Sequence, residues 1–257
     1  MDLKQSVIAI TGAGQGLGQM MAITLAQAGA ELALLDVNEE ALMDTKEQCN
    51  MLGVKALTYK ANVTDEHEVE QVFSDIVTDF GQLDGLINNA GILRDGLLVK
   101  VKDGEMTKMS LEQFNSVIDV NLTGTFLCGR EAAVQMINSN RKGVIINISS
   151  VARAGNIGQT NYAASKAAVA TLATTWGKEL ARYGIRAAAI APGVIETSMT
   201  GAMKPEARER LERMVPVGRM GDPKEIANTA KFIFENDYVN ARVFEVDGGI
   251  FLSLIHI

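Results

Sequence analysis

The chain has 257 residues, enough for one large domain with a substantial buried core. Hydrophobic residues make up 47% and charged residues 21%, with 24 Gly and only 4 Pro, a composition typical of folded globular proteins and not of disordered ones. The net charge of −7 argues against a nucleic-acid or anionic-membrane partner, because both need a basic surface.

The scarce cysteines and histidines exclude other kinds of site. Cys49 and Cys128 lie far apart, so neither a disulfide framework nor a zinc site is expected. His67 lies in an acidic run and His256 lies next to the last residue, which argues against a Ser-His-Asp triad or a histidine-bound metal. The sequence shows no signal-peptide pattern and no apolar run of roughly 18 residues. We therefore expect a cytoplasmic protein without a metal.

Apolar runs of strand length alternate with helical patterns along the chain. Val7-Ile8-Ala9-Ile10 predicts the first strand, and a helix to Gly29 and a strand at 32–35 complete a βαβ unit. Later strands are predicted near 54–60, 84–88, 143–149, 185–191 and 241–246, with helices near 39–52, 65–80, 110–139, 161–183 and 223–236. The helix starts at Asp65, Ser110 and Asp222 resemble capping boxes. Such alternation indicates a parallel sheet, because each crossover needs a helix.

We expect one domain over residues 1–257, with a nucleotide-binding half to about residue 90 and a catalytic and substrate half from about residue 91. Irregular segments are predicted at 91–109 and 192–204. Both follow strands at their carboxyl ends, where doubly wound sheets bind ligands.

A glycine-rich turn follows the first strand and opens the first helix. Gly12, Gly16 and Gly18 fit the pattern TGxxxGxG rather than GxGxxG, since Leu17 stands where the third glycine of GxGxxG would be. Such a turn lets backbone amides and a helix N-terminus approach a pyrophosphate, which predicts a dinucleotide site. A purely structural tight turn is the alternative interpretation.

Asp36 ends the second predicted strand, where a carboxylate can accept hydrogen bonds from the adenosine ribose. The same charge would repel the 2′-phosphate of NADP, and neither the turn, where Gln15 sits, nor residues 36–40 contain a Lys or Arg. The sequence therefore favours NAD(H) and does not exclude NADP(H). A cap for the helix after Asn38 is the alternative role of Asp36.

Tyr162 and Lys166 are four residues apart at the start of an alanine-rich helix, so they share one helix face. An adjacent ammonium stabilises a phenolate and is expected to lower the tyrosine pKa, which would let the pair act in acid–base chemistry without histidine. A surface Tyr and Lys is the alternative when the motif is considered alone.

The order of motifs along the chain resembles that of the short-chain dehydrogenase/reductase family over residues from about 5 to about 250. The motifs are the turn at 11–18, Asn88-Asn89-Ala90-Gly91, Asn121, Asn147-Ile148-Ser149-Ser150, Tyr162 with Lys166, and Pro192-Gly193. The resemblance implies a doubly wound α/β Rossmann fold with a seven-stranded parallel sheet, helices on both faces, and a homotetramer.

The resemblance also implies roles for single residues. Tyr162 would exchange a proton with the substrate oxygen, Lys166 would hold the nicotinamide ribose, and Asn121 would position a water. A serine would stabilise the carbonyl oxygen. Ser149 has the usual spacing of 13 from the tyrosine, and Ser150 precedes a hydrophobic residue as the catalytic serine does, so Ser150 is favoured and Ser149 stays open. The expected cofactor contacts are Gly12, Gln15, Gly16, Leu17, Gly18, Asp36, Asn62, Val63, Asn89, Ala90, Gly91, Tyr162, Lys166, Pro192, Gly193, Val194, Ile195 and Thr197.

Residues 91–95, 121–124 and 158–162 are similar to 3-oxoacyl-(acyl-carrier-protein) reductases and acetoacetyl-CoA reductases. The resemblance implies hydride transfer between NAD(P)(H) and a 3-oxoacyl or 3-hydroxyacyl thioester carried by acyl carrier protein or CoA. The lysines of segment 91–109 would meet such a carrier, or the segment is a solvated hairpin. An NAD-dependent dehydrogenase of a polyol, hydroxyketone or steroid is the alternative. The intact Ser, Tyr and Lys argue against a non-enzymatic nucleotide-binding scaffold. The apolar tail 251–257 has two alternative interpretations: it packs at a subunit interface, or it is not part of the native sequence.

Overall fold

The structure is a computed structural model that describes residues 1–197 and 205–250. Its first half comprises β1 (Val7–Thr11), α1 (Gly16–Gln27), β2 (Glu31–Asp36), α2 (Glu39–Met51), β3 (Ala56–Lys60), α3 (Glu66–Phe80) and β4 (Gly85–Asn88). The second half comprises β5 (Val99–Lys102), β6 (Glu105–Lys108), α4 (Leu111–Ile118), the π-helical turn η1 (Asp119–Thr123), α5 (Gly124–Asn138), β7 (Gly143–Ile148), the 3₁₀ turn η2 (Val151–Ala154), α6 (Thr160–Glu179), the 3₁₀ turn η3 (Ala181–Tyr183), β8 (Ile185–Pro192), α8 (Pro205–Met214), α9 (Pro223–Glu235) and β9 (Arg242–Val246).

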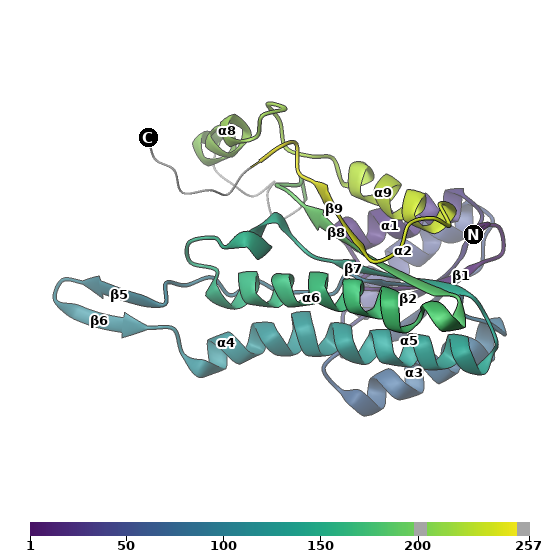
Figure 1. Cartoon of the computed structure of the whole chain (residues 1–257). Coiled ribbons are helices and arrows are strands. Elements are labelled where there is room, and N and C mark those ends of the chain that lie inside the picture. The colour runs from purple at the N-terminus through teal and green to yellow at the C-terminus, as the bar shows by residue number, and fades with distance from the viewer. Residues whose placement is uncertain (198–204, 251–257) are drawn as a thin grey trace.

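Seven strands form one sheet in the order β3-β2-β1-β4-β7-β8-β9, and every neighbouring pair is parallel. Helices cover both faces (Figure 1). The predicted doubly wound Rossmann fold is therefore confirmed. The strand order reverses between β1 and β4, and the carboxyl ends of these two strands open the crevice where such sheets bind ligands.

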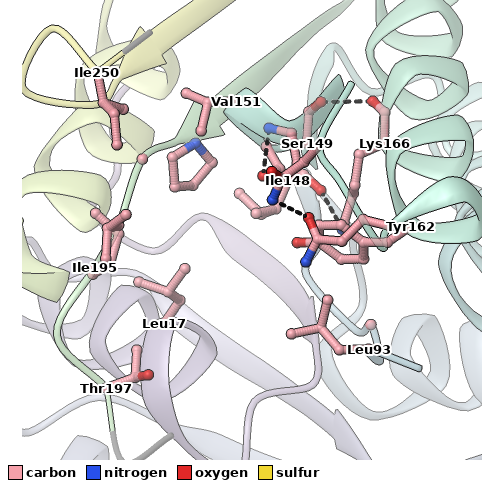
Figure 2. A pocket seen from close by; sticks show the side chains of 18 of the residues that line it. Leu17, Leu93, Ile148, Ser149, Val151, Tyr162, Lys166, Ile195, Thr197 and Ile250 are labelled. Carbon is pink, nitrogen blue, oxygen red and sulfur yellow. Dashed lines mark hydrogen bonds between the residues drawn. The ribbon is translucent and has the colours of Figure 1, made fainter. Parts of the chain in front are cut away.

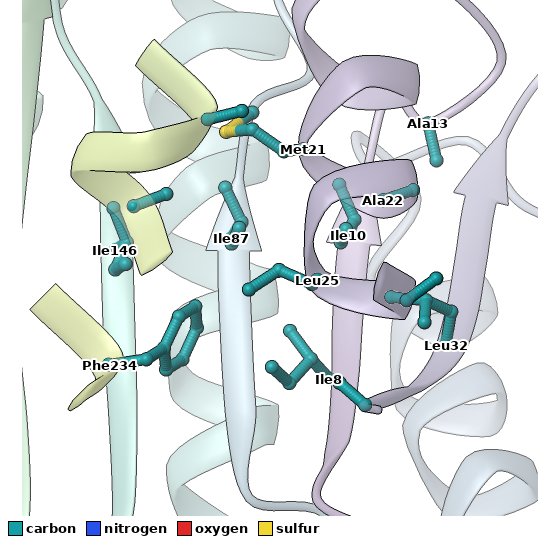
Figure 3. Close-up of a cluster of buried hydrophobic side chains, with 14 of the residues drawn as sticks. Ile8, Ile10, Ala13, Met21, Ala22, Leu25, Leu32, Ile87, Ile146 and Phe234 are labelled. Atoms are coloured by element: carbon teal, nitrogen blue, oxygen red, sulfur yellow. The ribbon is translucent and has the colours of Figure 1, made fainter. Parts of the chain in front are cut away.

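Each central strand feeds two cores because successive side chains point to opposite faces. In β1, Ile8 and Ile10 join a core with helices α1 and α9, which contribute Leu25 and Phe234 (Figure 3). Val7 and Ala9 join the core on the other face, beneath α3 and α5. Burial on both faces explains why these strands are continuous apolar runs in the sequence.

The three predicted helix starts are present, but only one is a complete capping box. Asp65, Ser110 and Asp222 each accept a hydrogen bond from a backbone N–H of the first helical turn. Glu225 also returns its carboxylate to the Asp222 N–H, completing the box there. The side chains of Glu68 and Gln113 instead bind other segments, so those two predictions were wrong in this detail.

Two segments differ from the prediction. The helix expected at 110–139 contains the π-helical turn η1, and helix α8 was not predicted. The segment 91–109, expected to be irregular with a solvated hairpin as one alternative, contains the exposed hairpin of β5 and β6. Residues 198–204 and the apolar tail 251–257 lie outside the described residues. None of the described helices combines the length and the apolar character that crossing a membrane requires.

Candidate active site

The turn between β1 and α1 is a cradle of backbone amides. Gly12 and Gly16 have φ values of +64° and +57°, which favour glycine. A Cβ on Gly18 would lie 2.0 Å from the Gly12 carbonyl oxygen, whereas one on Gly16 would meet no atom within 4 Å. Gln15 caps α1 without a side-chain hydrogen bond, and no acid lies in its first turn. An open turn at a positive helix end therefore fits the diphosphate of a dinucleotide.

The segment after β4 is fastened to this turn. The Thr11 hydroxyl accepts hydrogen bonds from the N–H groups of Asn89 and Ala90, both at 3.0 Å. The Asn89 amide donates to the carbonyl oxygens of Thr11 and Gly12, at 3.1 and 3.0 Å. Asn89 thus holds the segment after β4 against the glycine turn.

Asp36 lies at the end of β2 beside the glycine turn. Its carboxylate accepts hydrogen bonds from the Gly14 N–H and the Asn38 N–H, both at 3.0 Å. Asn38 itself caps α2, so the alternative role of Asp36 as the cap is wrong. The sheet register places Lys60 of β3 opposite Asp36, and the Lys60 ammonium lies 3.8 Å from the Glu39 carboxylate. The structure thus brings a cation beside Asp36 that the local sequence does not contain.

Asn62 and Val63 follow β3 at the same sheet edge, outside the cavity that Tyr162 lines. The Asn62 side chain accepts hydrogen bonds from the Thr64 N–H and hydroxyl, and Val63 packs closely against Gly124. Across residues 1–197 and 205–250, no group of three or more His, Cys, Asp or Glu side chains is placed to hold a metal ion.

Tyr162 and Lys166 lie on the face of α6 that borders the crevice (Figure 2). The Lys166 ammonium lies 5.7 Å from the centre of the Tyr162 ring and donates a hydrogen bond to the Ile148 carbonyl oxygen at 2.8 Å. Lys166 is only 5% exposed, and this burial lowers the pKa of its ammonium to about 8. The predicted pairing of these two residues at one site is present.

The pKa of Tyr162 moves opposite to the sequence prediction. Burial raises the pKa of the phenol above its ordinary value, and the negative charge of Asp95 raises it further. A hydrogen bond with the Ser150 hydroxyl acts in the lowering direction but is smaller than the effect of burial. The prediction of a lowered pKa was wrong for the described protein, because it considered the lysine and not the desolvation of the phenol.

The two adjacent serines have different environments. Ser149 is 2% exposed, and its hydroxyl donates a hydrogen bond to the Lys166 carbonyl oxygen at 2.6 Å. Ser150 is the serine that hydrogen-bonds with Tyr162, and its hydroxyl also accepts from the Ala152 N–H at 3.1 Å. Of the two, the geometry therefore puts Ser150 beside the phenol. The bond to Ala152 also makes Ser150 the cap of the 3₁₀ turn η2.

Asn121 lies within the π-helical turn and is fully buried. Its amide clamps the backbone of Ile92, accepting from the N–H at 2.8 Å and donating to the carbonyl oxygen at 3.1 Å. The same amide donates to the Ser165 hydroxyl at 3.2 Å. A Cβ on Gly91 would lie 3.3 Å from the Asn121 oxygen and 3.5 Å from the Lys166 nitrogen, so this glycine allows close packing beside both.

The opposite wall of the crevice follows β8. The Gly193 N–H donates to the Val246 carbonyl oxygen, and a Cβ on Gly193 would lie 2.6 Å from the Asp247 Cα, so the chain passes β9 closely there. The cavity between these walls is open to solvent on one side and measures about 520 Å³. Its lining combines predicted residues with unpredicted ones: Leu17, Asn89, Gly91, Ser149, Ser150, Tyr162, Lys166, Pro192, Gly193, Val194, Ile195 and Thr197, joined by Ile92, Leu93, Ile148, Val151, Ala152, Asn156, Gln159, Leu211, Met214 and Ile250.

A polar network at the cavity mouth was missed in the sequence. The Gln159 amide donates to the Asp95 carboxylate at 3.0 Å. The Gln113 amide donates to the carbonyl oxygens of Arg94 and Asp95, and the buried Asn161 amide donates to that of Arg94. These bonds join three segments that are distant in the chain, and no local pattern in the sequence marks them.

Comparisons with known proteins agree over nearly the whole chain. A family model described as enoyl-(acyl carrier protein) reductase matches residues 12–251. A 3-oxoacyl-[acyl-carrier-protein] reductase of Thermotoga maritima is 41% identical over 97% of this chain and 99% of its own length. A (3R)-3-hydroxyacyl-CoA dehydrogenase of Mus musculus is 36% identical over 98% of both chains. The solved structure of an NAD⁺-bound xylitol dehydrogenase superposes with a TM-score of 0.87 at 30% identity, covering 97% of this chain and 100% of that one.

Proposed function

Because the chain belongs to the short-chain dehydrogenase/reductase family, we propose that it reduces 3-oxoacyl thioesters to 3-hydroxyacyl thioesters. The family membership confirms the resemblance found in the sequence motifs. The observation that carries the proposal is the cluster of Tyr162, Lys166 and Ser150 at a cavity with an apolar wall. We further propose that the protein acts in the cytoplasm as a homotetramer.

Tyr162 is the proton donor. Its raised pKa keeps the phenol protonated at neutral pH, so it carries a proton ready for the substrate oxygen. Ser150 shares a hydrogen bond with this phenol and is positioned to donate to the same oxygen as negative charge develops there. When bound, a reduced nicotinamide supplies the hydride that reaches the carbonyl carbon.

Lys166 and Asn121 organise the floor of the site. Lys166 presents a buried ammonium beside Tyr162, and this charge favours the phenolate once the proton has left. A nicotinamide ribose would be held by the same ammonium. Asn121 fixes the Ile92 backbone at the cavity wall, and its proposed role in a proton relay rests on the family resemblance.

NAD(H) is the cofactor that Asp36 favours. The glycine turn would hold its diphosphate, and the Asp36 carboxylate would accept hydrogen bonds from the adenosine ribose. A 2′-phosphate at this place would meet the same negative charge. Lys60, opposite Asp36 in the sheet, is the residue that would favour NADP(H), and its proximity to Glu39 offsets part of its charge.

The apolar lining supports an acyl substrate. Leu93, Val151, Leu211 and Met214 line the same cavity as Ser150 and Tyr162, and such side chains suit a hydrocarbon chain better than a chain of hydroxyl groups. Relatives named as a 3-oxoacyl-[acyl-carrier-protein] reductase and a (3R)-3-hydroxyacyl-CoA dehydrogenase also act on acyl thioesters. Acyl carrier protein or CoA is thus the proposed carrier. The similarity to a xylitol dehydrogenase favours an NAD-dependent polyol dehydrogenase as the second candidate.

Steady-state rates with NADH and NADPH test the proposal on acetoacetyl-CoA, acetoacetyl-carrier protein and xylitol. We expect turnover of both thioesters and a preference for NADH. Turnover confined to the polyol with NAD⁺ would replace the proposal with the second candidate, and a preference for NADPH would overturn the argument from Asp36.

The variant Tyr162→Phe tests the proton donor. Removing one hydroxyl should lower kcat/KM by at least about 10²-fold, a typical contribution of general acid catalysis. NADH binding, measured by fluorescence titration, should stay within about twofold because the ring remains in place. Near-normal turnover of the variant would show that another group supplies the proton.

A further inference from the structure

Helix α8 forms part of the wall of the cavity that Tyr162 lines. Its side chains Leu211 and Met214 line the same cavity, and they share one helix face because they are three residues apart. The helix lies outside the layers formed by the sheet and its covering helices (Figure 1). Its position beside the cavity therefore depends on the contacts that fasten it to the rest of the chain.

The C-terminal end of α8 is fastened by a buried side chain and by the backbone. Val215 directly follows the helix and is buried. The Val217 N–H donates a hydrogen bond to the Gly248 carbonyl oxygen at 3.2 Å. A helix that is held at one end can still pivot about that end. The direction of α8 is therefore set by contacts nearer to its start.

Arg208 supplies such a contact near the start of α8. Its Nη2 donates a hydrogen bond to the Glu196 carboxylate at 2.8 Å, and its Nε donates one to the Glu212 carboxylate at 2.9 Å. Glu212 lies one turn further along the same helix and orients the guanidinium, whereas Glu196 belongs to the segment after β8. Among the ion pairs between described residues, the pair of Arg208 with Glu196 is the one that joins α8 to another part of the chain.

The backbone of Glu196 is itself held in place. Its N–H donates a hydrogen bond to the Gly221 carbonyl oxygen at 2.8 Å, and the Gly221 N–H donates one to the Val194 carbonyl oxygen at 2.9 Å. Gly221 directly precedes Asp222, whose capping box begins α9. Helix α9 packs in the core on one face of the sheet. The carboxylate that binds Arg208 is thus attached to a well-packed part of the molecule.

A second ion pair on α8 provides a comparison. Arg213 donates a hydrogen bond to the Glu209 carboxylate at 3.3 Å, and both residues belong to α8. With 3.6 residues per turn, these two side chains point away from the helix face that carries Leu211 and Met214. This pair joins two turns of the same helix, so it does not fasten α8 to the rest of the chain.

We propose that Arg208 is a positioning residue for acyl-chain specificity: its ion pair with Glu196 holds α8 where Leu211 and Met214 contact the far end of the acyl chain. The inference rests on the proposed reduction of 3-oxoacyl thioesters. Arg208 is not among the residues that line the cavity, so it acts through α8. An acetoacetyl group ends next to the reacting carbonyl, whereas a 3-oxooctanoyl chain extends further along the apolar wall. The ion pair therefore matters for the longer chain.

The exposure of the ion pair limits the size of its effect. The side chains of Arg208 and Glu196 are 39% and 53% exposed, so the pair is weak and is screened by salt. A contact of this kind changes an equilibrium by about two- to fivefold. Loss of the pair should therefore displace α8 in part of the molecules without unfolding the protein.

The ratio of KM for 3-oxooctanoyl-CoA to KM for acetoacetyl-CoA tests the proposal, because the ratio cancels the binding of the shared CoA group. For Arg208→Gln we expect this ratio to rise about two- to fivefold, with kcat for acetoacetyl-CoA unchanged. Arg208→Lys keeps the charge and should restore part of the wild-type ratio. Arg213→Gln is the matched control, since it removes the same charge from the same helix, and its ratio should equal that of the wild type.

Two further measurements separate the ion pair from other effects of the substitutions. Glu196→Gln should raise the KM ratio by the same factor as Arg208→Gln, and the double variant should raise it no further, because both changes break one contact. Sodium chloride at about 1 M should bring the wild-type ratio to that of Arg208→Gln, since it screens an exposed pair.

An unchanged KM ratio in Arg208→Gln, or an equal rise in Arg213→Gln, would overturn the inference and leave the proposed reaction in place. Additive effects of the Arg208 and Glu196 substitutions would also overturn it, because the two side chains would then act separately. A wild type that turns over neither thioester would instead refute the proposed function and, with it, the role of Arg208 in acyl-chain specificity.

Discussion

Among single residues, Asp95 influences the pKa of Tyr162 although its own side chain is exposed. Its carboxylate raises the pKa of Tyr162, together with burial and against the hydrogen bond from Ser150. Asp95→Asn keeps an oxygen for the Gln159 amide and removes the charge. Since reduction needs a protonated phenol, the alkaline limb of the pH profile of kcat/KM should move to lower pH.

The matched control for this prediction is Asp103→Asn in the turn between β5 and β6. It removes the same charge at a position that does not influence the Tyr162 pKa. Equal displacement of the pH profile in both variants would show that Asp95 acts through net charge rather than through its place at the cavity mouth.

Lys166 links the catalytic site to stability. Burial lowers the pKa of its ammonium from 10.5 to about 8. Between these two pH values the unfolded chain binds a proton that the folded chain does not, so the free energy of unfolding contributed by this group rises with pH. Relative to Lys166→Met, the wild type should gain about 1.4 kcal/mol per pH unit in that window. Urea unfolding at pH 7.5 and 9.5 measures the difference, and an equal difference at both pH values would contradict the burial of a charged lysine.

At the scale of elements, the glycine turn and α1 must pack closely enough to form the cradle. A Cβ on Gly18 would lie 2.0 Å from the Gly12 carbonyl oxygen, so Gly18→Ala must displace backbone and should lower the free energy of unfolding by roughly 3 kcal/mol. Gly16→Ala meets only the strain of a positive φ, about 1 kcal/mol. Urea unfolding without cofactor compares the two, and a Gly16 variant as unstable as the Gly18 variant would refute the packing argument.

The elements that could be predicted are those whose signal is local. Buried parallel strands are apolar runs, and helix starts carry Ser or Asp caps, so the sheet and most helices followed from the sequence. The π-helical turn did not, because no local pattern marks it; its residue Asn121 hydrogen-bonds the backbone of Ile92, 29 positions earlier in the chain. The hairpin was one of the two alternatives that the sequence left open for residues 91–109, and its Asp-Gly turn is the local signal for it, since both residues take the positive φ that a two-residue turn requires.

In the candidate site, too, residues within sequence motifs were predicted, and contacts between distant residues were not. Family motifs identified Tyr162, Lys166 and the glycine turn, whereas the choice between Ser149 and Ser150 needed the directions of their side chains. The contact of Gln159 with Asp95 joins residues 64 positions apart. The pKa of Tyr162 depends on desolvation, which a sequence does not display. The features that could not be predicted therefore depend on tertiary structure, namely which side chains are in contact and how far they are shielded from water.

Over the whole molecule, an ion pair with a buried carboxylate stabilises the fold at the amino edge of the sheet, and the proposed catalytic residues lie at the carboxyl edge. Asp84 precedes β4 at the amino edge and is 3% exposed. It accepts hydrogen bonds from the Val7 N–H at 2.9 Å and from the Gln82 amide at 2.8 Å, and it pairs with Arg141 at 2.5 Å. This carboxylate thereby joins β1, β4 and the segment before β7.

Asp84→Ala should lower the free energy of unfolding by about 3 kcal/mol, because it leaves a buried N–H without its acceptor and breaks the ion pair. Asp84→Asn keeps an acceptor and should lose less. Both variants should retain kcat/KM within about twofold at 25 °C, since Tyr162 and Ser150 stand at the carboxyl edge. Urea unfolding and steady-state rates on the same samples separate the two properties. A loss of kcat/KM in proportion to the loss of stability would mean that strain at the amino edge reaches the crevice through β4. That strand ends at Asn88, and the segment after it is hydrogen-bonded to the glycine turn.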